Sequence, residues 1–232
     1  MRINKDMFMD KRQALLELAV KRKQTTYRDY KRLSDYNDGK HECDYVTPYT
    51  KGAGKVNADI FILLLDWASD KQMKKEITHE EEAEELLFGR TLNQKTNINL
   101  EMLLCKHFKI DLKDTYATNL FPYIKSRDIP DKDLRWAAKE FALPQIAIVQ
   151  PKLVICCGLD TFNAVRVAAG HKEVDNVEEG INAPFSLYGS EVWLQSHPGI
   201  LGTNNRNSGG VDRVSGDWEK MAASFPRLCS EK

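Results

Sequence analysis

The segment DIFILLLD, residues 59–66, decides the fold of this chain. Its six consecutive apolar residues lie between two aspartates, and a run this short and this apolar favours a strand buried on both faces. KLVICCG at residues 152–158 has the same character, and TYATNLF at 115–121 and SEVWLQ at 190–195 are two further strand candidates. Strands covered on both faces are typical of parallel sheets in α/β proteins.

Segments with helical patterning alternate with these four strands. The expected helices cover residues 6–34, 78–87, 97–108 and 131–150, a segment that begins after Gly158, and a closing segment over residues 214–228. We predict a capping box at Thr78 and Glu81, an N-cap at Asn97 or Asn99, and a bend or break near Pro144. Asp160 or Thr161 is expected to cap the helix after Gly158.

This alternation predicts the architecture. We expect an α/β fold, a three-layer α/β/α sandwich with a mostly parallel four-stranded central sheet. A chain of 232 residues fits one domain of this class. The predicted division is a helix and loop in residues 1–57 followed by the α/β core in residues 58–232.

Composition excludes several classes of protein. Lys and Arg number 34, and so do Asp and Glu, which excludes a strongly basic nucleic-acid binder but leaves room for a local basic patch. A hydrophobic content of 42% excludes a disordered chain, and no apolar run approaches the roughly 18 residues that span a bilayer. We therefore expect no membrane association, and a monomer.

The cysteines and the N-terminal residues indicate in which cellular compartment we expect the protein. Five cysteines without a CxxC pair favour a reducing compartment over a disulfide framework. The first residues lack an apolar segment, so we expect no secretory signal and a cytoplasmic, nucleoid or nuclear location. His41 and Cys43 have no second pair to complete a zinc site, and we predict no metal and no cofactor.

Polar residues stand where the predicted strands end. In a parallel sheet the ligand site lies at the carboxyl ends of the strands, which directs attention to Asp66, Asn119 and His197. Each has an alternative structural reading. Asp66 can be the N-cap of the next helix, Asn119 a turn residue bonding its own backbone, and His197 a bridge between loop backbone groups.

The stretch at residues 115–165 resembles the uracil-DNA glycosylase superfamily. The features that carry the resemblance are Asn119, Pro122, Arg127, Gln145-Ile146, Pro151, Val154 and Gly158. SHPGILG at residues 196–202 is similar to the family's His-Pro-Ser loop, and LLLDWAS at 63–69 lies at the place of its strand-ending polar motif. The resemblance runs from about residue 58 to residue 228.

The resemblance implies an activity. It implies a DNA glycosylase of base excision repair that flips a damaged or modified base, in the first instance uracil or a related pyrimidine, and hydrolyses its N-glycosidic bond. Asp66 would then position water or stabilise a cationic sugar, and His197 would donate a hydrogen bond to the departing base. Asn119 would read the pyrimidine edge.

Further residues follow from the same resemblance. Phe88, Phe121 and Trp67 are expected beside the substrate, although either phenylalanine can equally be core. Ile200 and Leu201, in an expected loop at residues 200–213, would fill the gap left by the flipped base, or else staple their own loop. The expected DNA contacts are Arg206, Lys55 and Arg127, with a flexible loop as the alternative for Lys55.

The chain also departs from the family pattern. Two leucines precede Asp66 where the family has glycine and a small or polar residue, Gly199 replaces the serine of the His-Pro-Ser loop, and the four iron–sulfur cysteines are absent. Two alternatives therefore stay open: a non-catalytic nucleic-acid-binding protein of the same fold, and a small-molecule hydrolase acting on nucleoside-like substrates. Five basic residues distinguish these readings: Lys51, Lys55, Lys125, Arg127 and Arg206. If they surround the cleft of Asp66 and His197, DNA is favoured, and if they are scattered, it is not.

Overall fold

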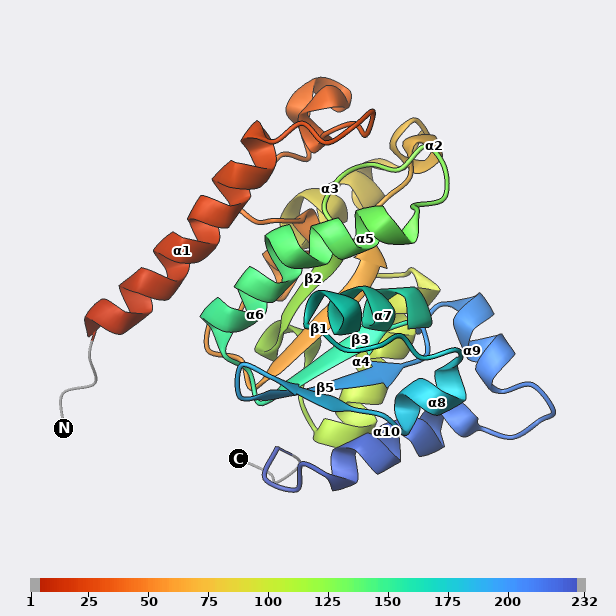
Figure 1. Ribbon diagram of the computed structural model, residues 1–232. Coiled ribbons are helices and arrows are strands. Elements are labelled where there is room, and N and C mark those ends of the chain that lie inside the picture. Colours follow the sequence, from red (N-terminus) through yellow and green to blue (C-terminus); the bar gives the residue numbers. More distant parts are fainter. Residues whose placement is uncertain (1–4, 229–232) are drawn as a thin grey trace.

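The computed structural model describes residues 5–228, with side chains from residue 11 onward (Figure 1). Within these residues one sheet has five strands in the order β2-β1-β3-β5-β4. They are β1 (Ile60–Asp66), β2 (Tyr116–Phe121), β3 (Leu153–Cys157), β4 (Phe185–Leu187) and β5 (Ser190–Gln195). All neighbours are parallel except β4 and β5. The predicted α/β class and mostly parallel sheet are confirmed, but the predicted count of four strands is wrong.

The strand that the sequence did not reveal is β4, at the edge of the sheet. It has three residues and pairs with β5 through a hairpin whose two turn residues, Tyr188 and Gly189, have φ of 52° and 85°. Two successive positive φ values are characteristic of the type I′ turn, whose twist matches that of paired strands. A three-residue strand is too short to show an alternating pattern.

Alternate side chains of β1 enter two separate cores. Phe61 and Leu63 belong to the core on one face of the sheet, whereas Ile60, Ile62 and Leu64 belong to the core on the other. The first core is covered by α5 (Asp131–Ala137), α6 (Leu143–Val149) and α7 (Leu159–Ala168), and the second by α4 (Lys95–Phe108) and α10 (Arg213–Ala223), as Figure 1 shows. Burial on both faces is the reason that this strand has no polar position before Asp66.

The described residues form five further helices. They are α1 (Lys5–Gln24), α2 (Asp70–Met73), α3 (His79–Phe88), α8 (Val177–Ile181) and α9 (Ile200–Arg206), and short 3₁₀ turns lie at Leu33–Asp35, Asn37–Gly39, Pro48–Gly52 and Leu112–Asp114. The capping box predicted at Thr78 and Glu81 is present at the start of α3. No helix in the described part of the chain is long and apolar enough to cross a membrane.

Several predicted helix boundaries are wrong. The helix predicted for residues 97–108 begins at Lys95 with Gln94 as N-cap, because Asn97 turns inward and is bonded inside the protein. No side chain caps α7, whose N-cap is Gly158. A π-helical turn, Ala138–Ala142, joins α5 to α6 just before Pro144. The closing helix ends at Ala223.

The first helix stops ten residues before the predicted end. It ends at Gln24, and the chain then turns so that the hydroxyls of Tyr27 and Tyr30 both donate to the carboxylate of Asp133, at 2.9 Å each. Arg28 adds an ion pair to the same carboxylate at 2.9 Å, and its φ of 53° is not helical. We call these four residues the Asp133 cluster. They fix the N-terminal segment on α5, because Asp133 is fully buried and fully partnered.

Candidate functional site

A cleft of about 1110 Å³ opens at the carboxyl edge of the sheet, and Asp66, Asn119 and His197 all line it. The register of β1 and β2 explains why Asp66 and Asn119 lie close together. Leu64 lies opposite Asn119 and Asp66 opposite Phe121, so β1 and β2 end at the same edge of the sheet. His197 follows β5, whose last residue pairs with the last residue of β3. Three side chains from distant parts of the chain therefore face one space.

Asp66 forms an ion pair with Lys125. The distance between Lys125 Nζ and Asp66 Oδ1 is 2.9 Å, and the two side chains are 28% and 14% exposed. The backbone of Lys125 is fixed as well, since its carbonyl accepts a hydrogen bond of 2.7 Å from Asp70 N–H. Asp66 is not a helix cap, because Ser69 caps α2. The structural alternative for Asp66 is thereby removed, and its second oxygen has no hydrogen-bond partner in the described part of the chain.

The imidazole of His197 is held in one tautomer. The backbone N–H of Gly199 donates to His197 Nδ1 at 3.0 Å, so the proton of the neutral ring is on Nε2. Burial lowers the pKa of His197 below 6.5, an effect that the Asp66 carboxylate opposes and the Lys125 ammonium supports. The ring therefore presents a neutral N–H donor at neutral pH.

Two glycines allow the chain to pack this closely around His197. A Cβ on Gly202 would lie 2.2 Å from the carbonyl oxygen of His197, and one on Gly199 would lie 2.9 Å from His197 Nδ1. Asn99 of α4 also donates to the Pro198 carbonyl at 2.8 Å. The glycine that departs from the His-Pro-Ser pattern is thus part of a tightly packed turn whose backbone orients the imidazole.

Asn119 is 2% exposed, and within the described residues its side-chain oxygen has no hydrogen-bond partner. It lies inside β2 rather than in a turn, which removes the alternative that it bonds its own turn backbone. Its backbone N–H donates to Thr47 Oγ1 at 3.2 Å. A buried amide oxygen without a partner costs roughly 1–3 kcal/mol, and such a group is typical of a site reserved for a ligand.

The aromatic residues divide between the cleft and the core. Phe121 is 0% exposed and packs edge-on against Tyr30, so the expectation that it stacks on a substrate is wrong. Phe88 ends α3 and is absent from the cleft lining. Trp67 does line the cleft, where its indole N–H donates to the Gly89 carbonyl at 2.7 Å.

The basic residues expected to contact DNA do not surround the cleft. Lys55 lies at the opposite, amino edge of the sheet, where its N–H bonds the Thr115 carbonyl and its ammonium pairs with Asp114. Arg206 is bound by Asp217 at 2.6 Å and by Glu178, which satisfies its guanidinium within the protein. Lys55 and Arg206 are therefore not gathered around Asp66 and His197, which is the arrangement that does not favour DNA.

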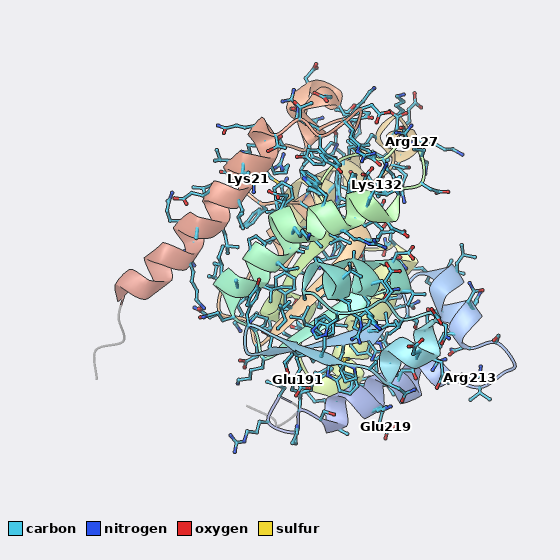
Figure 2. The ribbon with its side chains drawn as sticks, viewed as in Figure 1. Lys21, Arg127, Lys132, Glu191, Arg213 and Glu219 are labelled. Atoms are coloured by element: carbon cyan, nitrogen blue, oxygen red, sulfur yellow. The ribbon has the colours of Figure 1, made fainter. Side chains whose placement is uncertain are left out.

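Arg127 is the third of these residues. It is exposed and pairs with Asp29 at 3.0 Å, and Figure 2 shows it on the outer surface near α2. It does not line the cleft. Of the basic residues considered from the sequence, Lys125 is the one that the structure places beside Asp66.

Ile200 and Leu201 are not in a loop. They form the first residues of α9, directly after the His197 turn, and are 57% and 78% exposed. Both side chains are available to a partner, although neither is among the residues that line the cleft. The prediction of a loop over residues 200–213 is wrong for residues 200–206, which form α9.

The sequence also gave no signal for the far wall of the cleft. His41 is 3% exposed, its Nδ1 has no hydrogen-bond partner, and Glu85 Oε2 lies 4.0 Å from it. Burial lowers the pKa of His41 and raises that of Glu85. Tyr49 also lines this side. These residues come from a loop, a helix and a 3₁₀ turn that no local pattern connects.

In residues 5–228 no group of three or more His, Cys, Asp or Glu side chains is placed to hold a metal ion. The cysteines of this region are unpaired, and burial raises the pKa of Cys156 and of Cys157, the latter to about 12. Both lie inside β3 as small apolar residues.

Comparison with known proteins adds no relative: no family model matches this chain, and no curated protein matches it.

Proposed function

We propose that this protein hydrolyses N-glycosidic bonds and that its substrate is a damaged or modified base, in the first instance uracil, flipped out of DNA. The observation that carries the proposal is the meeting of Asp66, Asn119 and His197 in one cleft. A carboxylate, an unpartnered buried amide and a neutral imidazole donor are the groups that base removal requires. The resemblance to uracil-DNA glycosylases in the sequence supports the same chemistry.

Asp66 acts on water and on the sugar. Its Oδ1 is bonded to Lys125, which leaves Oδ2 to orient a water molecule toward C1′ of the nucleotide. The negative carboxylate also stabilises positive charge that develops on the sugar as the glycosidic bond lengthens. No metal ion is needed for either role.

His197 acts on the departing base. As the bond breaks, negative charge moves onto the base, and a uracil carries much of it on a ring oxygen. An N–H donor fixed by the Gly199 backbone stabilises that oxygen without reorganising, because its tautomer is already set. Asn119 supplies the matching donor and acceptor for the base edge, a role that gives its unpartnered oxygen a ligand.

One observation favours a second candidate, a hydrolase of free nucleosides. Lys55 and Arg206 are engaged away from the cleft, and the cleft wall formed by α3 carries Glu81, Glu82 and Glu85. Acidic residues at the rim repel a phosphate backbone but not an uncharged nucleoside. The exposed pair Ile200 and Leu201 argues for DNA instead, since apolar side chains are suited to filling a gap in a base stack.

The test is a panel of oligonucleotides that carry single uracil, oxidised, alkylated or deaminated bases, in single-stranded and duplex form. Alkaline cleavage reveals each abasic product, and free deoxynucleosides are assayed in parallel by release of the base. Cleavage of an oligonucleotide supports the DNA glycosylase, and cleavage of free nucleosides alone selects the second candidate. A folded protein that releases no base from any of these substrates refutes both.

A further inference from the structure

Among the side chains that the structure describes, Lys125 is the one lysine that forms an ion pair with Asp66, His197 or Asn119. Its Nζ is 2.9 Å from Asp66, it lines the same cleft as His197, and its charge acts on the imidazole. The side chain is 28% exposed, so a ligand in the cleft can reach the amine. Neither the proposed hydrolysis nor the packing of the core assigns a role to this amine.

The position of Lys125 works against a purely hydrolytic site. A carboxylate that stabilises a cationic sugar acts through its negative charge, and an ammonium 2.9 Å away cancels part of that field. The ion pair favours the charged ammonium, so a nucleophilic role for the amine requires a group beside it that takes its proton, and Asp66 is placed to do so. A carboxylate at hydrogen-bond distance can take the ammonium proton, and a lysine amine freed of its proton attacks carbonyl carbon.

We infer that Lys125 forms a Schiff base with the aldehyde of an abasic deoxyribose, which gives the protein an abasic-site lyase activity in addition to base removal. This inference rests on the proposed function, because base removal from DNA produces that sugar in the same cleft. The ligand class is an open-chain aldehyde flanked by phosphodiesters. Lys125 is the nucleophile, and Asp66 is the proton carrier.

The atoms of the step balance without an oxidant or reductant. Asp66 takes one proton from the Lys125 ammonium, the Nζ lone pair bonds to C1′, and the carbonyl oxygen receives a second proton from nitrogen. Asp66 then returns its proton to this hydroxyl, which leaves as water while a C1′=N bond forms. Asp66, again a carboxylate, then takes a C2′ proton, and the electron pair of that C–H bond forms a C2′=C3′ bond as the C3′–O bond breaks. The downstream strand leaves as a 5′-phosphate monoester, and water later hydrolyses the imine.

The experiment traps the imine by reduction. An oligonucleotide with a preformed abasic site is incubated with the protein and sodium cyanoborohydride, and covalent adducts are counted on a denaturing gel. Lys125→Arg keeps the positive charge near Asp66 but cannot form the imine. Lys125→Met removes the positive charge and the amine together. Lys74→Arg is the matched control, since Lys74 lies at the rim of the same cleft but bonds Asp70.

We expect an adduct with the wild type and with Lys74→Arg, and at least a 20-fold smaller yield with both Lys125 variants. Peptide mapping should place the sugar on Lys125. The inference is overturned by absence of a wild-type adduct, or by equal yields from wild type and Lys125→Arg. Because the abasic site is preformed, this outcome is independent of base release. A protein that releases base but forms no adduct refutes the lysine step alone, and one that forms the adduct but releases no base refutes the glycosylase alone.

Discussion

Two regions of this molecule bury polar groups in opposite ways. In the Asp133 cluster, a carboxylate that is 0% exposed accepts from two tyrosine hydroxyls and pairs with Arg28. In the cleft, the side-chain oxygen of Asn119, at 2% exposure, has no hydrogen-bond partner among the residues that the structure describes. The first arrangement satisfies every group and fixes the N-terminal segment on α5. The second leaves a desolvated acceptor beside open space.

The Asp133 cluster and the cleft are expected to respond differently to substitution. A buried polar group with all its hydrogen bonds stabilises the fold or destabilises it little. A buried polar group without a hydrogen bond lowers the free energy of unfolding, and packing elsewhere must compensate for it. Substitutions in the Asp133 cluster should therefore reduce stability, and substitutions at the cleft should alter chemistry more than stability. Five predictions test this contrast, from the largest expected effect to the smallest.

Asp133→Ala should lower the free energy of unfolding by roughly 3 kcal/mol, because the buried hydroxyl of Tyr30, the partly buried hydroxyl of Tyr27 and Arg28 lose their acceptor. Arg28 contributes the smaller part, since its side chain is 38% exposed. Urea unfolding measures the change. The control is Asp131→Ala on the same helix, whose carboxylate is 78% exposed and whose loss should cost within about 0.5 kcal/mol. Equal effects of the two substitutions would contradict the structural role of the cluster.

Asp66→Asn should keep the fold and slow base release by roughly 10²-fold or more, the usual range for a lost acid–base or electrostatic group. The amide oxygen of the variant can still accept from Lys125, so the cleft should retain its shape. Single-turnover cleavage of the best substrate measures the rate. Asp59→Asn, just before the other end of the same strand, is the control and should leave the rate unchanged. A wild-type rate in well-folded Asp66→Asn would show that the site is misassigned.

Gly202→Ala should destabilise the protein by roughly 1–3 kcal/mol and reduce base release, because the new methyl group would lie 2.2 Å from the His197 carbonyl oxygen and must displace that turn. Gly216→Ala is the control, since a Cβ there meets nothing within 4 Å and alanine favours the helix. Thermal melting and single-turnover rates are measured on both variants. If Gly202→Ala is as stable and as active as Gly216→Ala, the close approach has no consequence for the site.

The lowered pKa of His197 predicts a loss of stability on the acid side. Below pH about 6.5 the unfolded chain binds a proton at this residue that the folded chain resists, so the free energy of unfolding falls as pH falls. The slope from this group is at most about 1.4 kcal/mol per pH unit and ends below the folded pKa. Denaturation at pH 7.5, 6.5 and 5.5 should show a smaller loss in His197→Gln than in the wild type. Identical slopes would mean that His197 titrates alike in both states.

Asn119→Ala should change the free energy of unfolding by less than about 1 kcal/mol despite its burial, because its side chain makes no hydrogen bond to lose. Asn97→Ala is the matched comparison, since Asn97 is also 2% exposed but bonds the Tyr49 hydroxyl and the Thr91 carbonyl and should cost more. In cleavage assays Asn119→Ala should shift which base is preferred. Equal stability costs for the two asparagines would remove the distinction on which the comparison rests.

Most of the architecture follows from local patterns in the sequence. The continuous apolar runs predict β1 and β3, and Thr78 with Glu81 predicts the start of α3. The errors have particular causes. The strand β4 is three residues long and is specified by its turn, and the first helix ends early because Tyr27 and Tyr30 bond Asp133, a residue more than 100 positions away.

The sequence by itself determined that Asp66, Asn119 and His197 lie toward the carboxyl ends of strands, and a parallel sheet brings those ends to one edge whatever the loops do. Only the tertiary structure decided which neighbours join them. It placed Lys125 against Asp66 and Arg206 against Asp217, and it buried Phe121 among core aromatics. The physical reason is one of range. A strand buried on both faces shows a continuous apolar run within about seven residues, which can be recognised in the sequence. An ion pair or a shared cleft depends instead on how segments far apart in the chain pack together, and the spacing of residues does not reveal this.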